Sequence, residues 1–160
     1  PGAPVVLLGM AGEAGDHEYG WILPARRRSG GLRAVLSFVE KPHPEKSREL
    51  AARGALVNSF IFASRASTLV RLYEDALPGL LRAFLQVVLA RSQKERLGEL
   101  YDEIPSRDFS RAVLERLPGS LGVLAVPPCG WSDLGTPSRL ERFLEGRPRL
   151  ERMAPAPGAV

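Results

Sequence analysis

The sequence predicts an α/β fold in which helices flank a largely parallel or mixed β-sheet. The main observation is that short apolar runs of strand length alternate with helical patterns over most of the chain. A second is that residues 5–10 are continuously apolar, which is typical of a strand buried on both faces of a parallel sheet. Folds of this class bind ligands in loops at the carboxyl ends of strands, so the loops after Met10, Glu40 and Val126 are the first places to examine.

The predicted strands are short segments rich in Val, Leu, Ile and Phe, and they lie at residues 5–10, 18–24, 32–40, 56–63 and 121–126. Between the second and the third strand the chain is basic and ends in Ser29-Gly30-Gly31, which is a turn signal. These two strands are therefore predicted to form a hairpin with a basic tip.

Helices are predicted at four places. Pro44 suits a first turn and Gly54 a C-terminal cap, which brackets a helix at 45–53. Residues 64–96 carry two apolar stripes at helical spacing, interrupted at Leu77-Pro78-Gly79. The remaining helices are expected at 108–117, with Ser106 or Asp108 as N-cap, and from Thr136-Pro137 through Leu144. Residues 1–146 are predicted to form one partial domain, and the Pro-, Gly- and Ala-rich residues 147–160 a disordered tail.

Composition narrows the class of protein. The 160 residues are 44% hydrophobic and 25% charged, as in an ordinary globular domain. We find neither a signal peptide nor an apolar run long enough to span a bilayer, so we expect a cytoplasmic protein with no membrane partner. Cys129 is the single cysteine, which leaves no intrachain disulfide. The net charge is +4, but the arginines are scattered, which disfavours nucleic acid as a partner.

Two charged motifs stand out at predicted strand ends. In Phe38-Val39-Glu40-Lys41-Pro42 the lysine could meet a phosphate and the glutamate could accept hydrogen bonds from sugar hydroxyls. The alternative is an exposed ion pair. In the segment 130–136, Asp133 lies between two glycines just before a helix, which suits an open Mg²⁺ site. The alternative there is a turn in which the carboxylate accepts a hydrogen bond from its own backbone.

Two further residues are unusual for the strands that contain them. Asn58 lies in the apolar segment 56–62, where its amide needs polar partners, so it either caps a neighbouring loop or faces a polar ligand. Gly20 lies inside a predicted strand and permits close approach of a ligand to the backbone; the alternative is a β-bulge.

These motifs, in their order, resemble those of a known family. The series EYGWI, FVEKP, NSFIF, RDFSRAVLE and GWSDLGT resembles the C-terminal part of the sugar-1-phosphate nucleotidyltransferase domain, and within that family the mannose-1-phosphate guanylyltransferases. The resemblance runs from about Val5 to Phe143, and FVEKP and GWSDLGT are its specific parts. It implies a Rossmann-like mixed sheet flanked by helices, a partial nucleotide-diphospho-sugar transferase fold whose N-terminal nucleotide-binding half is missing.

The resemblance also implies roles for the motif residues. Glu40 and Lys41 would hold the sugar and its phosphate, Asn58 would contact sugar hydroxyls, and the backbone at Gly20 would approach the sugar or its phosphate. Asp133 would be one of two carboxylates that bind Mg²⁺, the implied cofactor. Lys41 and Asp133 would be the catalytic residues, and the helix that begins at Asp108 would pack near the sugar site.

The implied reaction is nucleotidyl transfer from a nucleoside triphosphate, here GTP, to mannose-1-phosphate, giving a nucleotide-sugar and pyrophosphate. The family's Gly-rich nucleotide loop and its other metal-binding aspartate are not found in these 160 residues. We therefore expect a fragment that is inactive alone; the alternative is a non-catalytic relative that binds sugar phosphate and pairs with a full-length homologue. Without the missing half, Val6, Leu7 and Leu8 would lie near an exposed sheet edge, and a homodimer through that edge is a further hypothesis.

Overall fold

The computed structural model describes residues 5–26 and 31–145. The chain divides into two compact units, residues 1–128 and residues 129–160. The predicted tail at 147–160 and most of the predicted basic tip, residues 27–30, lie outside the described residues. The division into one domain at 1–146 and a tail stays a prediction.

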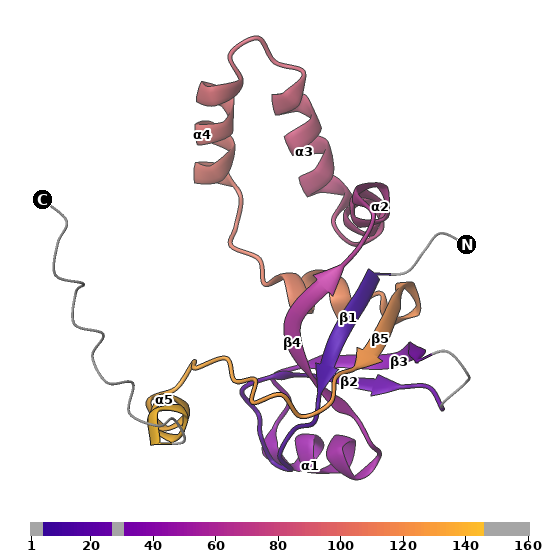
Figure 1. Cartoon of the computed structure of the whole chain (residues 1–160). Helices are drawn as coiled ribbons and strands as arrows, with labels where there is room; N and C mark the ends of the chain where they lie inside the picture. The colour runs from indigo at the N-terminus through magenta and orange to yellow at the C-terminus, as the bar shows by residue number, and fades with distance from the viewer. Residues whose placement is uncertain (1–4, 27–30, 146–160) are drawn as a thin grey trace, which may run out of the picture. The chain divides into compact units, whose positions relative to one another are not determined.

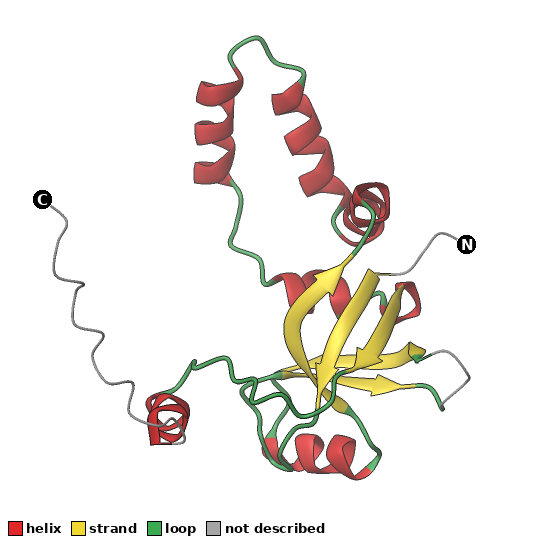
Figure 2. Ribbon diagram, in the orientation of Figure 1, coloured by secondary structure: helices red, strands yellow, loops and turns green. Residues whose placement is uncertain are grey.

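The strands of the described residues all lie in the first unit and match the predicted positions. They are β1 (Val5–Met10), β2 (Gly20–Pro24), β3 (Leu32–Glu40), β4 (Leu56–Ala63) and β5 (Leu121–Ala125). The strands form a closed barrel in the order β1-β4-β2-β3-β5, and their curvature around a common interior is visible in Figures 1 and 2. The predicted hairpin is confirmed, because β2 and β3 pair antiparallel from Gly20 and Glu40 onward.

The predicted fold class, an α/β Rossmann-like mixed sheet flanked by helices, is wrong. The sheet is closed rather than open, and among the strand pairs of the described chain only β1 with β5 is parallel. Closure depends on β3, which is nine residues long. Its C-terminal part pairs with β2, and its first residues, Leu32 to Ala34, pair with β5. Apolar patterning identifies each strand separately and does not say which strands become neighbours, so this closure is not visible in the sequence.

The predicted exposed edge at residues 6–8 is also not found in the described barrel. Strand β1 pairs with β4 on one side and with β5 on the other. Its backbone N–H and C=O groups therefore have neighbours in both directions, and β1 is not an edge strand. The homodimer stays a prediction, without this edge to support it.

The helices follow the predictions with two differences. They are α1 (Pro44–Ala52), α2 (Ala66–Ala76), α3 (Pro78–Val88), α4 (Gln93–Glu103), the π-helix η1 (Ser110–Leu114), the 3₁₀ helix η2 (Pro118–Ser120) and α5 (Pro137–Glu145). Pro44 opens α1, and Gly54 follows its end with φ +76°, as a C-terminal cap requires. The first difference is α4, whose polar sequence gave little signal. The second is that the helix predicted at 108–117 contains a π-helix.

The core lies between the barrel strands, α2 and η1. Its buried residues are Val5, Leu7, Ile22, Val35, Phe38, Leu72, Ala76, Val113, Leu114, Leu121 and Val123. In contrast, α3 and α4 contain no buried residue, and they project from the barrel as a pair of neighbouring helices (Figure 1). Among the described helices, none combines the length and the apolar composition that crossing a bilayer would take.

Candidate functional site

Three of the predicted substrate-binding residues lie at one level of the barrel. Gly20 on β2 pairs with Glu40 on β3. On the other side of β2, Trp21 pairs with Val57 of β4. Continuing this antiparallel register by one residue sets Asn58 opposite Gly20. Asn58, Gly20 and Glu40 are therefore consecutive across three neighbouring strands, although they come from three separate segments of the chain.

Gly20 makes room for the carboxylate of Glu40. A Cβ atom added to Gly20 would lie 2.5 Å from Glu40 Oε2 and 2.8 Å from Cζ of Phe38. Non-bonded carbon and oxygen atoms do not approach so closely. The predicted close approach to the Gly20 backbone is thus made, in the protein itself, by the side chain of its partner on β3.

The electrostatic surroundings of Glu40 raise its pKa above the ordinary value. Burial is the largest cause, and the nearby carboxylate of Asp108 adds to it by repulsion. The hydroxyl of Ser110, which donates a hydrogen bond to Glu40, and the cations of Lys41 and Arg111 act in the opposite direction. Sequence reasoning noted Asp108 only as a helix start and missed Ser110, because nothing local connects either residue to β3.

Replacing Glu40 with Gln is expected to raise the free energy of unfolding at pH 7. A carboxyl whose pKa rises on folding stabilises the folded state fully below its ordinary pKa of about 4.5, and this contribution is lost as pH rises through the folded-state pKa. The gain should be about 0.5 kcal/mol, because solvent screens a half-buried charge. Urea unfolding at pH 7 and pH 4 measures it, and the gain should largely disappear at pH 4.

Glu49 offers a matched control of opposite sign. Its hydrogen bonds from Lys46 and Arg53 lower its pKa. Glu49→Gln should therefore lower stability at neutral pH and have less effect as the pH falls. A Glu40→Gln variant that loses stability at pH 7, or gains it equally at both pH values, would contradict the electrostatic account.

Three backbone irregularities surround the level of Gly20, Glu40 and Asn58. Lys41, directly after Glu40, has φ +47°, and Phe60, two residues after Asn58, has φ +59°. Phe60 N donates a hydrogen bond to Asn58 Oδ1 at 3.2 Å. The third is the π-helix η1: the ring of Phe60 meets that of Phe109, directly before η1, edge-on with centroids 6.3 Å apart. Left-handed non-glycine residues and π-helices both occur preferentially at functional sites.

Asp133 lies in the second unit, and its carboxylate has protein partners. Gly135 N donates to Asp133 Oδ1 at 3.1 Å, which is the turn considered as the alternative to a metal site. Arg139 Nη1 lies 3.1 Å from Oδ1 and 3.3 Å from Oδ2. The side chain of Arg139 is 10% exposed and that of Asp133 35%. Within residues 5–26 and 31–145, no group of three or more His, Cys, Asp or Glu side chains could hold a metal ion.

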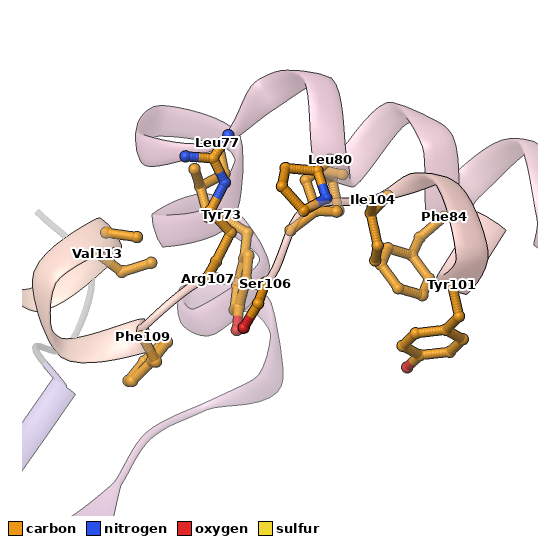
Figure 3. Close-up of a pocket in the computed structure, with 13 residues that line it drawn as sticks. Tyr73, Leu77, Leu80, Phe84, Tyr101, Ile104, Ser106, Arg107, Phe109 and Val113 are labelled. Atoms are coloured by element: carbon orange, nitrogen blue, oxygen red, sulfur yellow. The ribbon is translucent and has the colours of Figure 1, made fainter.

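A separate cavity of about 650 Å³ lies among α2, α3, α4 and η1 (Figure 3). Its walls are mainly aliphatic and aromatic, and its polar groups come from Tyr73, Tyr101, Ser106 and Arg107. The apolar stripes predicted for residues 64–96 supply part of the lining, such as Leu80 and Phe84. The cavity itself was not predicted, because its opposite wall comes from α4 and η1.

Comparisons with known proteins give two structural likenesses. The first is to a crystal structure described as mannose-1-phosphate geranyltransferase from Thermus thermophilus, with a TM-score of 0.75 and 28% identity over 90% of this chain and 41% of that chain. The second is to a crystal structure described as mannose-6-phosphate isomerase from Helicobacter pylori, with a TM-score of 0.65 and 17% identity over 82% of this chain and 52% of that chain. No protein-family model and no curated protein sequence matches.

These likenesses relate the fold to that of sugar-phosphate enzymes. Both solved proteins are described as enzymes of a mannose phosphate. The chain spans only 41% of the first and 52% of the second. The likeness to the isomerase, at 17% identity, concerns the fold alone.

Proposed function

We propose that this chain binds mannose-1-phosphate at the level of Gly20, Glu40 and Asn58 and serves nucleotidyl transfer to that sugar phosphate from GTP. The observation that carries the proposal is the alignment of these three residues on neighbouring strands, with Lys41 directly after them. The 28% identity to a protein described as acting on mannose-1-phosphate supports the choice of sugar.

The polar groups at this level complement a sugar phosphate. The Glu40 carboxylate accepts hydrogen bonds from hydroxyl groups, and such charge-assisted bonds are the stronger kind. Asn58 Oδ1 already accepts from Phe60 N, so its amide nitrogen would be the group that donates to a sugar oxygen. Lys41 is exposed and carries a compact positive charge suited to the phosphate.

In the proposed reaction a phosphate oxygen of mannose-1-phosphate attacks the α-phosphorus of GTP. A new oxygen–phosphorus bond forms, the bond between the α-phosphorus and the bridging oxygen breaks, and pyrophosphate leaves with that oxygen. Residues of the chain contribute by orientation and by neutralising charge, with no covalent intermediate. Glu40 and Asn58 would orient the sugar, and Lys41 would offset the charge of the attacking phosphate.

We propose Asp133 as a ligand of Mg²⁺ in the presence of substrate phosphates. Its fit is that of a single-carboxylate site, since Mg²⁺ is commonly held by one or two carboxylates together with waters and phosphate oxygens. The 35% exposure of the Asp133 side chain is compatible with this, but a metal ion would have to compete with Arg139 for both oxygens. A bound Mg²⁺ would supply charge neutralisation at the phosphates.

Mannose-1-phosphate is expected to raise the melting temperature of the chain, and Lys41→Gly should weaken this binding by about tenfold or more. Removing a charged hydrogen-bonding partner of a phosphate typically has an effect of this size. Glycine is chosen because φ at Lys41 is +47°, so the substitution removes the charge while relieving the left-handed backbone strain of a residue with a Cβ atom. Thermal shift at increasing ligand concentration gives both affinities.

Lys46→Ala is the matched control, because Lys46 is also a solvent-facing lysine and its partner is Glu49 within α1. Equal loss of affinity in both variants would indicate a nonspecific charge effect. Absence of any shift in the folded wild-type chain would contradict the proposal. Addition of GTP and Mg²⁺ with a pyrophosphate assay then separates transfer from binding alone.

The second candidate is a non-catalytic protein that binds sugar phosphate and pairs with a full-length homologue. The ion pair of Asp133 with Arg139 favours it, because a carboxylate held by arginine is a weaker metal ligand. Binding of mannose-1-phosphate without pyrophosphate release from GTP would support this candidate over the enzyme.

A further inference from the structure

We infer that Ser110 is a positioning residue, whose hydroxyl holds the carboxylate of Glu40 in the orientation that receives the sugar phosphate. The inference rests on the proposed function and adds a residue that neither the motifs nor the comparisons indicate. It starts from the observation that Glu40 receives its hydrogen bond from a distant segment, the first residue of η1.

The surroundings of the Ser110 hydroxyl favour a single role. Ser110 is 4% exposed, so its side chain is withdrawn from solvent. A buried hydroxyl needs a hydrogen-bond partner, and the partner that the structure gives it is Glu40. A serine that only filled space in this core could be alanine without leaving a polar group to satisfy.

The local backbone fixes the position of this serine. Glu115 N donates to Ser110 O at 2.8 Å, which is the wider hydrogen-bond spacing of a π-helix. Asp108 anchors the preceding turn, where its Oδ1 accepts from Arg111 N at 2.9 Å. Val113 and Leu114, on the same short helix, are fully buried in the core. Ser110 is therefore held on a rigid element facing the end of β3.

Glu40 is then constrained from several directions. The backbone of Gly20 and the ring of Phe38 lie beside its carboxylate. The Ser110 hydroxyl occupies part of its hydrogen-bonding capacity, and the remaining lone pairs are available to a ligand. The charged groups that act on it are Asp108, Lys41 and Arg111. Removing the Ser110 hydroxyl would take away the side-chain hydrogen bond that keeps the carboxylate in place beside the repelling Asp108.

The test is Ser110→Ala in the full chain, with mannose-1-phosphate as the probe. We expect binding to weaken about tenfold at pH 7, a loss typical of one hydrogen bond to a charged group. Because this hydrogen bond lowers the pKa of Glu40, the pH below which binding fails should also move upward in the variant. A purely structural role would weaken binding without moving this pH profile.

Two controls accompany the variant. Ser47→Ala removes another fully buried serine hydroxyl, which donates to Pro44 O at 2.9 Å inside α1, and it should leave sugar-phosphate binding unchanged. Carboxyl ¹³C NMR titration of Glu40, assigned with Glu40→Gln, reports the pKa of this group in each folded variant without any ligand. The Glu40 signal should titrate at higher pH in Ser110→Ala than in the wild type.

The outcomes separate the two proposals. A wild type that binds the probe, together with a weakened and pH-shifted Ser110→Ala, supports both. A wild type that binds, together with a Ser110→Ala variant of unchanged affinity, pH profile and Glu40 titration, overturns the role of Ser110 and leaves the proposed function standing. A folded wild type that does not bind mannose-1-phosphate overturns the proposed function, and the positioning role with it.

Discussion

Trp21→Ala is expected to lower the free energy of unfolding by about 3–5 kcal/mol, the range observed when a fully buried Trp or Phe is truncated. Trp21 has no exposed surface and pairs with Val39 on one side and Val57 on the other. Its indole Nε1 also donates to Asp16 O at 2.8 Å, which ties the loop before β2 to the barrel. Because small domains have only about 5–15 kcal/mol of stability, a loss of this size is a large part of the total.

Guanidinium unfolding followed by circular dichroism measures the loss, since removing Trp21 changes the fluorescence signal. Trp21→Phe is the informative comparison. It keeps an aromatic ring in the core and removes the indole N–H, so it should cost less than alanine but leave Asp16 O without this donor. A cost below about 1 kcal/mol for Trp21→Ala, far under the usual range for a buried aromatic, would show that the centre of the barrel packs differently from the structure described.

Gly20→Ala is expected to lower stability by about 1–3 kcal/mol, the usual cost of overpacking, and to abolish measurable mannose-1-phosphate binding. The added methyl would lie 2.5 Å from Glu40 Oε2 and 2.8 Å from the buried ring of Phe38. Overpacking of this kind forces side chains out of their preferred rotamers. The flexible end of Glu40 will give way more easily than the ring, so the carboxylate should leave its position at the site.

Gly98→Ala is the matched control for this substitution. Gly98 lies inside α4 and a Cβ there meets nothing within 4 Å. Because alanine favours the helix, this variant should gain about 0.5–1 kcal/mol and bind mannose-1-phosphate as the wild type does. Urea unfolding and ligand thermal shift on both variants give the comparison. Wild-type affinity in Gly20→Ala would argue against a role of the Glu40 position in binding.

The strands and most helices were predictable because their signals are local. Apolar runs of strand length, the break at Leu77-Pro78-Gly79 and the glycine after α1 each depend on a few adjacent residues. The closed barrel was not predictable in the same way, because it depends on Leu32–Ala34 meeting β5, a contact between distant parts of the chain. Helix α4 was missed because its sequence is mostly polar and it buries no residue.

The candidate site shows the same division. Gly20, Glu40 and Asn58 drew attention because each is unusual in its own segment, and the strand register brings the three together. Their binding roles stay predictions, as do those of Lys41 and Asp133. Ser110 could not be connected to Glu40 from the sequence, because a serine in a predicted helix carries no sign of the strand end that it faces.

Closure of the barrel has a consequence for synthesis of the protein. Among the described strands β1 is the first in the chain and β5 the last, yet the two are neighbours over Val5–Gly9 and Leu121–Ala125. As the chain leaves the ribosome, β1 can pair with β4 early, but its other side must wait until residues 121–125 have been made. The nascent barrel therefore passes through a stage with one open seam, and such sequence-distant contacts slow folding. Chaperone binding to that seam would protect the chain until its last strand arrives.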